Sequence, residues 1–288
     1  MILDHGCFIL LSKDSHELSR SDFQQSRRGG GQNCAQRYRR PKWTLAVGAL
    51  LLAVSSSLLA AAVNAAAIKP QREALQTSDG VILVGDLYAQ KQKSPTVIML
   101  HMLGRSRQAF QPLIAPLLAQ GLTIINIDLR GHGESIYRKD KSEISYKNFA
   151  ASDWAKLPSD AQTVIADAQK LPGVDGAKLA IIGSSIGANT AAMVSGDSHL
   201  KALVLLSPGQ NYHGLQPEKY LKGLEKPVLM FAGKGDQDSA RAVQQWQKLG
   251  TKFKVELLDT QAHGNDLLTQ RNNVIAEITA FLQAELKH

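Results

Sequence analysis

The chain has 288 residues, of which 44% are apolar and 20% are charged. This composition is typical of a globular protein and gives enough length for one large α/β domain and a leader. The formal net charge is +8, but about half of that excess lies before residue 68, and no basic run with interleaved aromatic residues follows. The charge therefore does not indicate nucleic-acid binding. Both cysteines, Cys7 and Cys34, also lie before residue 68, which excludes an internal disulfide or thiolate metal site from the remainder.

Residues 1–67 have the order of regions expected of a secretory signal. A polar, basic extension over residues 1–43 precedes an uncharged apolar stretch and a small-residue site within 44–67. This order predicts cleavage after Ala67, or a residue or two earlier, and export to the periplasm or the outside of the cell. The alternative is a membrane anchor formed by residues 44–63, which would be the chain's one membrane contact. The pair Arg39-Arg40 suggests twin-arginine export, although the residues after it fit that pattern poorly.

From residue 68 the chain reads as a β-hairpin followed by alternating strands and helices. Asp79-Gly80, between apolar segments 74–77 and 81–88, predicts the hairpin. The further predicted elements are strands at 96–101, 122–128, 178–182, 201–207, 227–232 and 254–258 and helices at 106–120, 159–171, 186–195, 239–249 and 266–286, with Ser159 capping the second helix. Apolar strands separated by helices predict a mainly parallel central sheet covered on both faces. Residues 68–288 are expected to form one catalytic domain without a large cap, because the segment 209–226 is too short for one.

The segment Gly183-Ser184-Ser185-Ile186-Gly187 lies directly between a predicted strand and a predicted helix. A nucleophile needs a sharp turn that pushes its side chain out of the sheet, and two glycines let the strand and helix backbones pass closely there. The spacing therefore predicts Ser185 as a nucleophile. The N–H of Ile186, at the start of the helix, is a candidate oxyanion donor.

A serine hydroxyl needs an adjacent base, and His263 is the best candidate. It follows the last predicted strand, at the carboxyl end of the sheet, where sites of parallel sheets lie. His213 is a possible lid residue in contact with substrate. The other downstream histidines are placed less well: His199 is expected at the opposite edge of the sheet and His288 is the last residue.

The acid that orients the base is expected after an earlier strand, because the acid precedes the histidine where this serine motif is catalytic. Asp236 lies three residues beyond the glycine that ends the strand 227–232, and Asp238 is the alternative. The loop after the preceding strand, 207–211, offers no carboxylate.

Two further loops follow predicted strands. His101-Met102-Leu103-Gly104 is expected to supply the second oxyanion donor, from the N–H of Leu103 or, less well, of Met102. The side chain of Met102 should narrow the substrate site. The segment Asp128–Ser135 is interpreted as a tight turn organised by glycines and polar side chains, with His132 in a structural role.

Taken together, these motifs resemble the α/β-hydrolase family, in the family's order and from about Ala74 to Leu286. The compact body is similar to the dienelactone-hydrolase and small-esterase branch. The resemblance implies a cofactor-free serine hydrolase that cleaves a carboxylic ester, lactone or thioester, with Ser185, His263 and Asp236 as its triad. One departure is Met102, which stands where the family's oxyanion motif has glycine.

Two alternatives to hydrolysis remain open. A non-catalytic binding protein could use the same fold, and an acyltransferase or perhydrolase could use the same triad with an acceptor other than water. The expected partner is a small-molecule acyl substrate. No cofactor or metal is expected, since the body lacks cysteine and a closely spaced cluster of His, Asp and Glu ligands.

Overall fold

The structure, a computed structural model, describes residues 68–270 and 273–287. The predicted leader, residues 1–67, lies outside the described residues. Within them, eight strands form one sheet. The strands are β1 (Gln71–Gln76), β2 (Ile82–Tyr88), β3 (Ser94–Leu100), β4 (Thr123–Ile127), β5 (Val174–Ser184), β6 (Leu200–Leu206), β7 (Val228–Gly233) and β8 (Phe253–Leu258).

The sheet has the order β1-β2-β4-β3-β5-β6-β7-β8. All strands from β3 onward run parallel, whereas β2 is antiparallel to both β1 and β4. The predicted hairpin at Asp79-Gly80 joins β1 to β2, and Gly80 has a φ of 84° that suits its turn. The chain therefore begins the sheet at one edge and then crosses it with connections of the α/β type.

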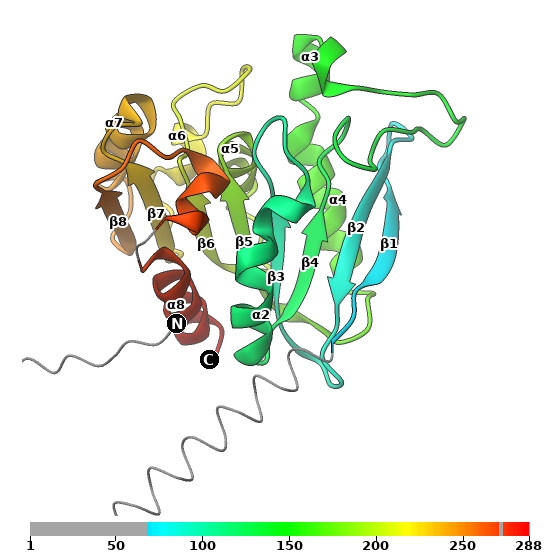
Figure 1. The fold of residues 1–288 in the computed structure, drawn as a ribbon, viewed down its shortest axis with the longest axis horizontal. Coiled ribbons are helices and arrows are strands. Elements are labelled where there is room, and N and C mark those ends of the chain that lie inside the picture. The colour runs from blue at the N-terminus through cyan, green and yellow to red at the C-terminus, as the bar shows by residue number, and fades with distance from the viewer. Residues whose placement is uncertain (1–67, 271–272, 288) are drawn as a thin grey trace, which may run out of the picture. The chain divides into compact units, whose positions relative to one another are not determined.

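Helices cover both faces of the sheet (Figure 1). The helical elements are η1 (Arg107–Phe110), α2 (Gln111–Ala119), η2 (Tyr146–Asn148), α3 (Ala151–Trp154), α4 (Leu157–Ala168), α5 (Ile186–Met193), α6 (Glu218–Leu221), α7 (Gln237–Trp246), η3 (Gly264–Thr269) and α8 (Val274–Leu286). Helices α2 and α8 pack on one face, and α4, α5 and α7 pack on the other. The predicted mainly parallel α/β fold with both faces covered is confirmed, and the described residues include no large cap domain.

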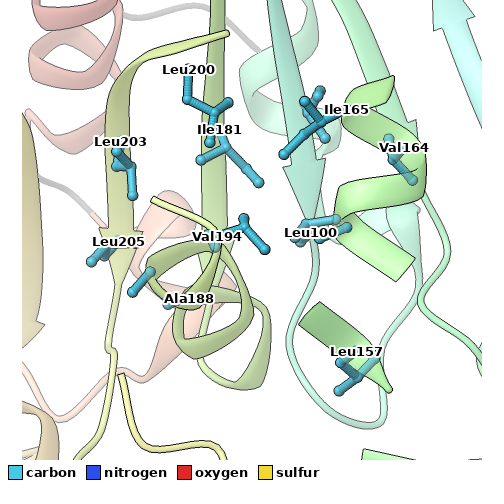
Figure 2. Packing of buried hydrophobic residues seen from close by; sticks show 14 of the residues in the cluster. Leu100, Leu157, Val164, Ile165, Ile181, Ala188, Val194, Leu200, Leu203 and Leu205 are labelled. Atoms are coloured by element: carbon cyan, nitrogen blue, oxygen red, sulfur yellow. The ribbon is translucent and has the colours of Figure 1, made fainter. Parts of the chain in front are cut away.

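Each central strand contributes side chains to the hydrophobic core on either face of the sheet, because its side chains alternate between the two faces. In β3, Ile98 and Leu100 face the α4–α5 side, whereas Val97 and Met99 face α2 and α8. Figure 2 shows part of the first core, where Leu100 and Ile181 of the sheet lie beside residues of α4 and α5. Fully burying one such aliphatic side chain contributes about 1.5–3 kcal/mol. The buried apolar side chains thus stabilise the sheet, and the candidate site lies at the carboxyl ends of its strands.

Three predicted helices differ from the structure. The expected helix 106–120 is η1 followed directly by α2. The expected single helix 266–286 is two elements, η3 and α8, because Gln270 ends η3 in an extended conformation with ψ of 154°. The second predicted helix begins at Leu157 rather than after a cap at Ser159, whose hydroxyl instead donates to the carbonyl of Lys156. Pro158 in the first turn favours this earlier start, since proline fits there without losing a hydrogen bond. Among the described helices, none is long and apolar enough to cross a bilayer.

Candidate active site

The candidate nucleophile Ser185 lies at the turn between β5 and α5, as predicted. Its backbone has φ of 52° and ψ of −116°, a conformation that side chains rarely adopt and that the surrounding structure must hold. A Cβ on Gly183 would lie 2.2 Å from the carbonyl oxygen of Gly187, and one on Gly187 would lie 2.2 Å from that of Leu100. Both glycines are therefore required for the close passage of strand and helix that places Ser185 at the end of the sheet.

Ser185, His263 and Asp236 lie in one hydrogen-bonded chain. The Nε2 atom of His263 is 2.7 Å from the Oγ of Ser185, and its Nδ1 atom is 2.7 Å from the Oδ2 of Asp236. Because a carboxylate can only accept, Nδ1 carries the proton, and in the neutral form of the ring Nε2 is left to accept from the serine hydroxyl. The structure thus brings together three side chains from the ends of β5, β7 and β8, in an arrangement able to remove a proton from Ser185.

The electrostatics of Asp236 favour its ionised form. Burial on its own raises the pKa of this carboxyl, but hydrogen bonds from His263 and Ser239 outweigh burial and lower the pKa below its ordinary value. The alternative acid, Asp238, points away: its side chain is 85% exposed and lies 3.9 Å from Arg241. Asp236 is therefore the carboxylate that the fold places against His263.

The predicted oxyanion loop lies directly after β3. Within the described chain, the N–H of Leu103 has no hydrogen-bond partner, whereas that of Met102 donates to the side chain of Asn265 at 3.2 Å. The N–H of Ile186, in the first turn of α5, is also without a partner in this part of the chain. Leu103 and Ile186 thus keep free donors beside the nucleophile turn, and Met102 does not.

His101, the first residue of this loop, and His132 are both buried. The Nε2 atom of His101 accepts from the N–H of Leu129 at 3.0 Å, so its Nδ1 atom is protonated and donates to the carbonyl of Met102 at 2.8 Å. Complete burial lowers the pKa of His101 to about 4, which keeps the ring neutral. His132 stacks on Tyr146 with ring centroids 4.0 Å apart. Neither histidine contacts Ser185, in accord with the structural role predicted for His132.

The segment Asp128–Ser135 is the polar turn that its sequence indicated. Asp128 accepts from the N–H of Glu134 at 2.9 Å and binds the guanidinium of Arg107, while Ser135 donates to the Asp128 carbonyl at 2.7 Å. Arg107 also binds Asp86 at 2.8 Å. A buried charge of this kind is tolerated only when it is paired and hydrogen-bonded. Among the described residues, no group of three or more His, Cys, Asp or Glu side chains is arranged to hold a metal ion.

Two segments border the site and touch each other. His213, after β6, is exposed and stacks on Trp154, after β4, with ring centroids 4.2 Å apart. Since β3 and β5 lie between β4 and β6 in the sheet, this contact spans the strands that carry Leu103 and Ser185. Tyr212 brings the same segment to the site, with its ring 6.2 Å from that of His263. The predicted contact of His213 with substrate stays a prediction.

An open cleft of about 660 Å³ lies beside the site. It runs from Gly104, next to Leu103, to Asn265, two residues beyond His263, and includes Tyr146. Ser185 and His263 do not line it, so the cleft adjoins the hydrogen-bonded chain rather than containing it. Its volume is in the range of small-molecule binding sites.

Sequence reasoning did not find Asn265, Tyr212 and Ser239. Asn265 binds the oxyanion loop, and Tyr212 contacts Ser239, 3.1 Å from hydroxyl to hydroxyl, which in turn supports Asp236. Only the position of Asn265, two residues after the candidate base, was a signal in the sequence. The other two contacts join segments that have no shared motif.

Comparison with known proteins agrees with the fold. No curated protein matches the chain, but solved structures do: an esterase of Pyrococcus furiosus at 18% identity and TM-score 0.61, covering 76% of this chain and 94% of that one. Est1E of Butyrivibrio proteoclasticus, solved with ferulic acid, matches at 19% identity and TM-score 0.60 over 75% and 100% of the two chains. At these identities the likeness shows the fold. The model of the family described as serine aminopeptidase, S33, matches residues 91–276, and the chain belongs to this family of α/β-hydrolases.

Proposed function

We propose that this protein is a serine hydrolase that cleaves a carboxylic ester, lactone or thioester through an acyl-enzyme. The observation that carries the proposal is the unbroken hydrogen-bonded chain from Ser185 through His263 to Asp236, with 2.7 Å at each step. A nucleophile within hydrogen-bond reach of a base, which is itself oriented by a third group, is the arrangement that nucleophilic catalysis needs.

In the proposed reaction, the Oγ of Ser185 bonds to the substrate carbonyl carbon while its proton passes to the Nε2 of His263. The carbonyl π electrons move to oxygen, where the N–H groups of Leu103 and Ile186 stabilise the negative charge. The tetrahedral intermediate then collapses, and the leaving group takes the proton from Nε2. Water attacks the acyl-enzyme, gives its proton to Nε2 and releases the acid, and Ser185 regains its proton. Throughout, Asp236 stabilises the charged form of His263.

The comparisons support an ester as the class of substrate. The neighbouring structures include esterases of Pyrococcus furiosus and Exiguobacterium antarcticum, whereas the family description names an aminopeptidase. We propose that part of the substrate lies in the open cleft between Gly104 and Asn265, next to the oxyanion loop. The half-buried side chain of Met102 would limit the space between that cleft and Ser185. The likeness to the dienelactone-hydrolase branch stays a prediction.

We also propose that the protein is exported, on the basis of the signal-like order of regions in residues 1–67. N-terminal sequencing of the purified mature protein tests this. A new N-terminus at or near residue 68 supports cleavage, and a mature protein that begins at Met1 contradicts it.

The deciding experiment for the catalytic proposal is labelling of the folded, full-length protein with a fluorophosphonate, followed by peptide mapping. We expect one adduct, on Ser185, and none in Ser185→Ala or His263→Ala. Turnover of p-nitrophenyl esters should fall by several orders of magnitude in both variants, while their circular dichroism spectra stay unchanged.

Two further assays separate the alternatives. An amino-acid p-nitroanilide tests peptidase activity, and product analysis with added alcohol or peroxide tests transfer to an acceptor other than water. Folded protein that takes no label and turns over no ester would favour the non-catalytic binding role. Ester turnover that persists in Ser185→Ala would refute the assignment of the nucleophile.

A further inference from the structure

Met102 stands at the position where the family's oxyanion motif has glycine, and both of its backbone polar groups are held by side chains. Its N–H donates to the Oδ1 of Asn265 at 3.2 Å, and its carbonyl accepts from the Nδ1 of His101 at 2.8 Å and also from the N–H of Arg105 at 3.3 Å. Both holding side chains are buried: Asn265 is 3% exposed and His101 is fully buried. The residue before the candidate oxyanion donor is therefore fixed at both of its peptide bonds.

The direction of the Leu103 N–H follows from this. The carbonyl of Met102 and the N–H of Leu103 belong to one planar, trans peptide unit, in which they point in opposite directions. The hydrogen bonds from His101 and Arg105 hold this carbonyl in one direction, and so hold the N–H of Leu103 in the opposite direction. The hydrogen bond that the Met102 N–H donates to Asn265 holds the preceding peptide unit and so restricts rotation of the loop about Met102.

Asn265 also joins this loop to the loop that carries the candidate base. It lies two residues after His263, and its Nδ2 atom donates to the carbonyl of Ala109, 3.4 Å away. Between His263 and Asn265, Gly264 has a φ of 59° and packs so tightly that a Cβ would lie 2.8 Å from the Oγ of Ser184 and 3.0 Å from the Sδ of Met102. The Met102 side chain thus occupies the space that glycine at 264 leaves open.

We infer that Asn265 is a positioning residue that holds the oxyanion loop in a fixed position relative to His263. The inference rests on the proposed hydrolase function, because an oxyanion donor has a role only if the site performs acyl transfer. A donor stabilises the transition state fully only when it is aimed at the developing charge in advance. Without Asn265, the loop would still be present but its N–H would lose this fixed aim.

The test is Asn265→Leu, which keeps the branched shape of the side chain and removes both hydrogen bonds. Losing one oxyanion donor outright typically costs roughly a hundred- to a thousandfold in rate. We therefore expect a misaimed donor to lower kcat by about tenfold to a hundredfold, with KM changed by less than about threefold. The inhibition constant of a trifluoromethyl ketone, which binds as an oxyanion, should rise in parallel with the fall in kcat/KM.

Thr123→Val is the matched control. Thr123 is buried, and its hydroxyl bonds to the carbonyl of Gly173 at 2.9 Å, to the N–H of Gln90 at 3.1 Å and to the hydroxyl of Ser94 at 2.9 Å. However, it lies at the start of β4, at the end of the sheet opposite the site. This variant should lose stability to a similar degree and keep wild-type kcat. Equal falls in kcat in the two variants would attribute the effect of Asn265→Leu to general destabilisation and overturn the inference.

Hydrogen exchange of the Met102 amide gives a readout that does not depend on activity. In the full-length protein, followed by NMR or by mass spectrometry of a peptide covering residues 99–105, we expect exchange to be at least about tenfold faster in Asn265→Leu and unchanged in Thr123→Val. Unchanged exchange in Asn265→Leu would refute the positioning contact. If wild-type protein hydrolyses no ester, the proposed function fails, and this exchange result still decides whether Asn265 holds the loop.

Discussion

The sharpest test of the site is the replacement of Asp236 by asparagine. The carboxylate accepts the Nδ1 proton of His263 at 2.7 Å, and an amide of nearly equal size can present an N–H₂ group there instead. The ring would then carry its proton on Nε2, the atom that has to accept the proton of Ser185. Asp236→Asn should therefore disable the base without removing a side chain or opening a cavity.

The expected magnitude is large because the substitution changes the tautomer of the base itself. The corresponding change in other Ser-His-Asp enzymes lowers kcat about 10⁴-fold, which corresponds to roughly 5.5 kcal/mol of activation free energy at 1.36 kcal/mol per tenfold. KM should stay within a few-fold of wild type, since Asp236 lies behind His263 and does not face the substrate. Asp238→Asn should keep the wild-type rate, because that side chain is 85% exposed.

The assay is steady-state hydrolysis of a p-nitrophenyl ester by both variants, with urea unfolding to show that each is folded. A loss of less than tenfold in Asp236→Asn would refute the reasoning from the tautomer. A comparable loss in Asp238→Asn would mean that the acid had been assigned to the wrong carboxylate.

Two further predictions concern stability. Burial lowers the pKa of His101 to about 4 in the folded protein, whereas the pKa of a histidine in an unfolded chain is about 6.5. Between these two pH values, His101 is therefore protonated only in the unfolded state. His101 should thus remove about 3 kcal/mol from the free energy of unfolding as pH falls from about 6.5 to about 4. Urea titrations should show a flatter pH dependence in His101→Asn, and an equal slope would contradict this origin. Gly133 has a φ of 52°, and a Cβ there would lie 2.1 Å from Oδ2 of Asp128, so Gly133→Ala should cost about 3 kcal/mol or more by displacing a buried carboxylate from its cation. Gly80→Ala, with φ of 84° and open space around its Cβ, should cost only about 1 kcal/mol, and equal urea midpoints for the two would argue against the clash.

The fold was largely predictable because its signals are local. Apolar runs with turn residues between them identified every strand from β3 to β8 and the hairpin before them. The split of the last predicted helix was not predictable in the same way. Leu267 and Leu268 in η3 are buried, and they continue an apolar pattern that also suits a helix. The break is a matter of how this segment packs on the sheet, which periodicity does not report.

The candidate site was predictable only as far as strand ends determine it. Ser185, Asp236 and His263 each follow a parallel strand, and the carboxyl ends of these strands lie at the same end of the sheet. Their proximity therefore follows from the topology. Asn265 is different, because its partner Met102 lies 163 positions away in the sequence. Such a contact depends on how two loops meet, and one sequence carries no pattern that predicts it.

The stack of Trp154 on His213 has a consequence for how this protein can diversify. The two rings belong to the connection after β4 and the connection after β6. Their contact therefore joins two connections that lie on either side of β3 and β5. Loops tolerate insertions that strands do not. Lengthening either connection by a residue or two would shift or break the contact between Trp154 and His213 while leaving the strands unchanged. If the protein acts as proposed, its substrate range could therefore change through loop length alone, with the sheet unchanged.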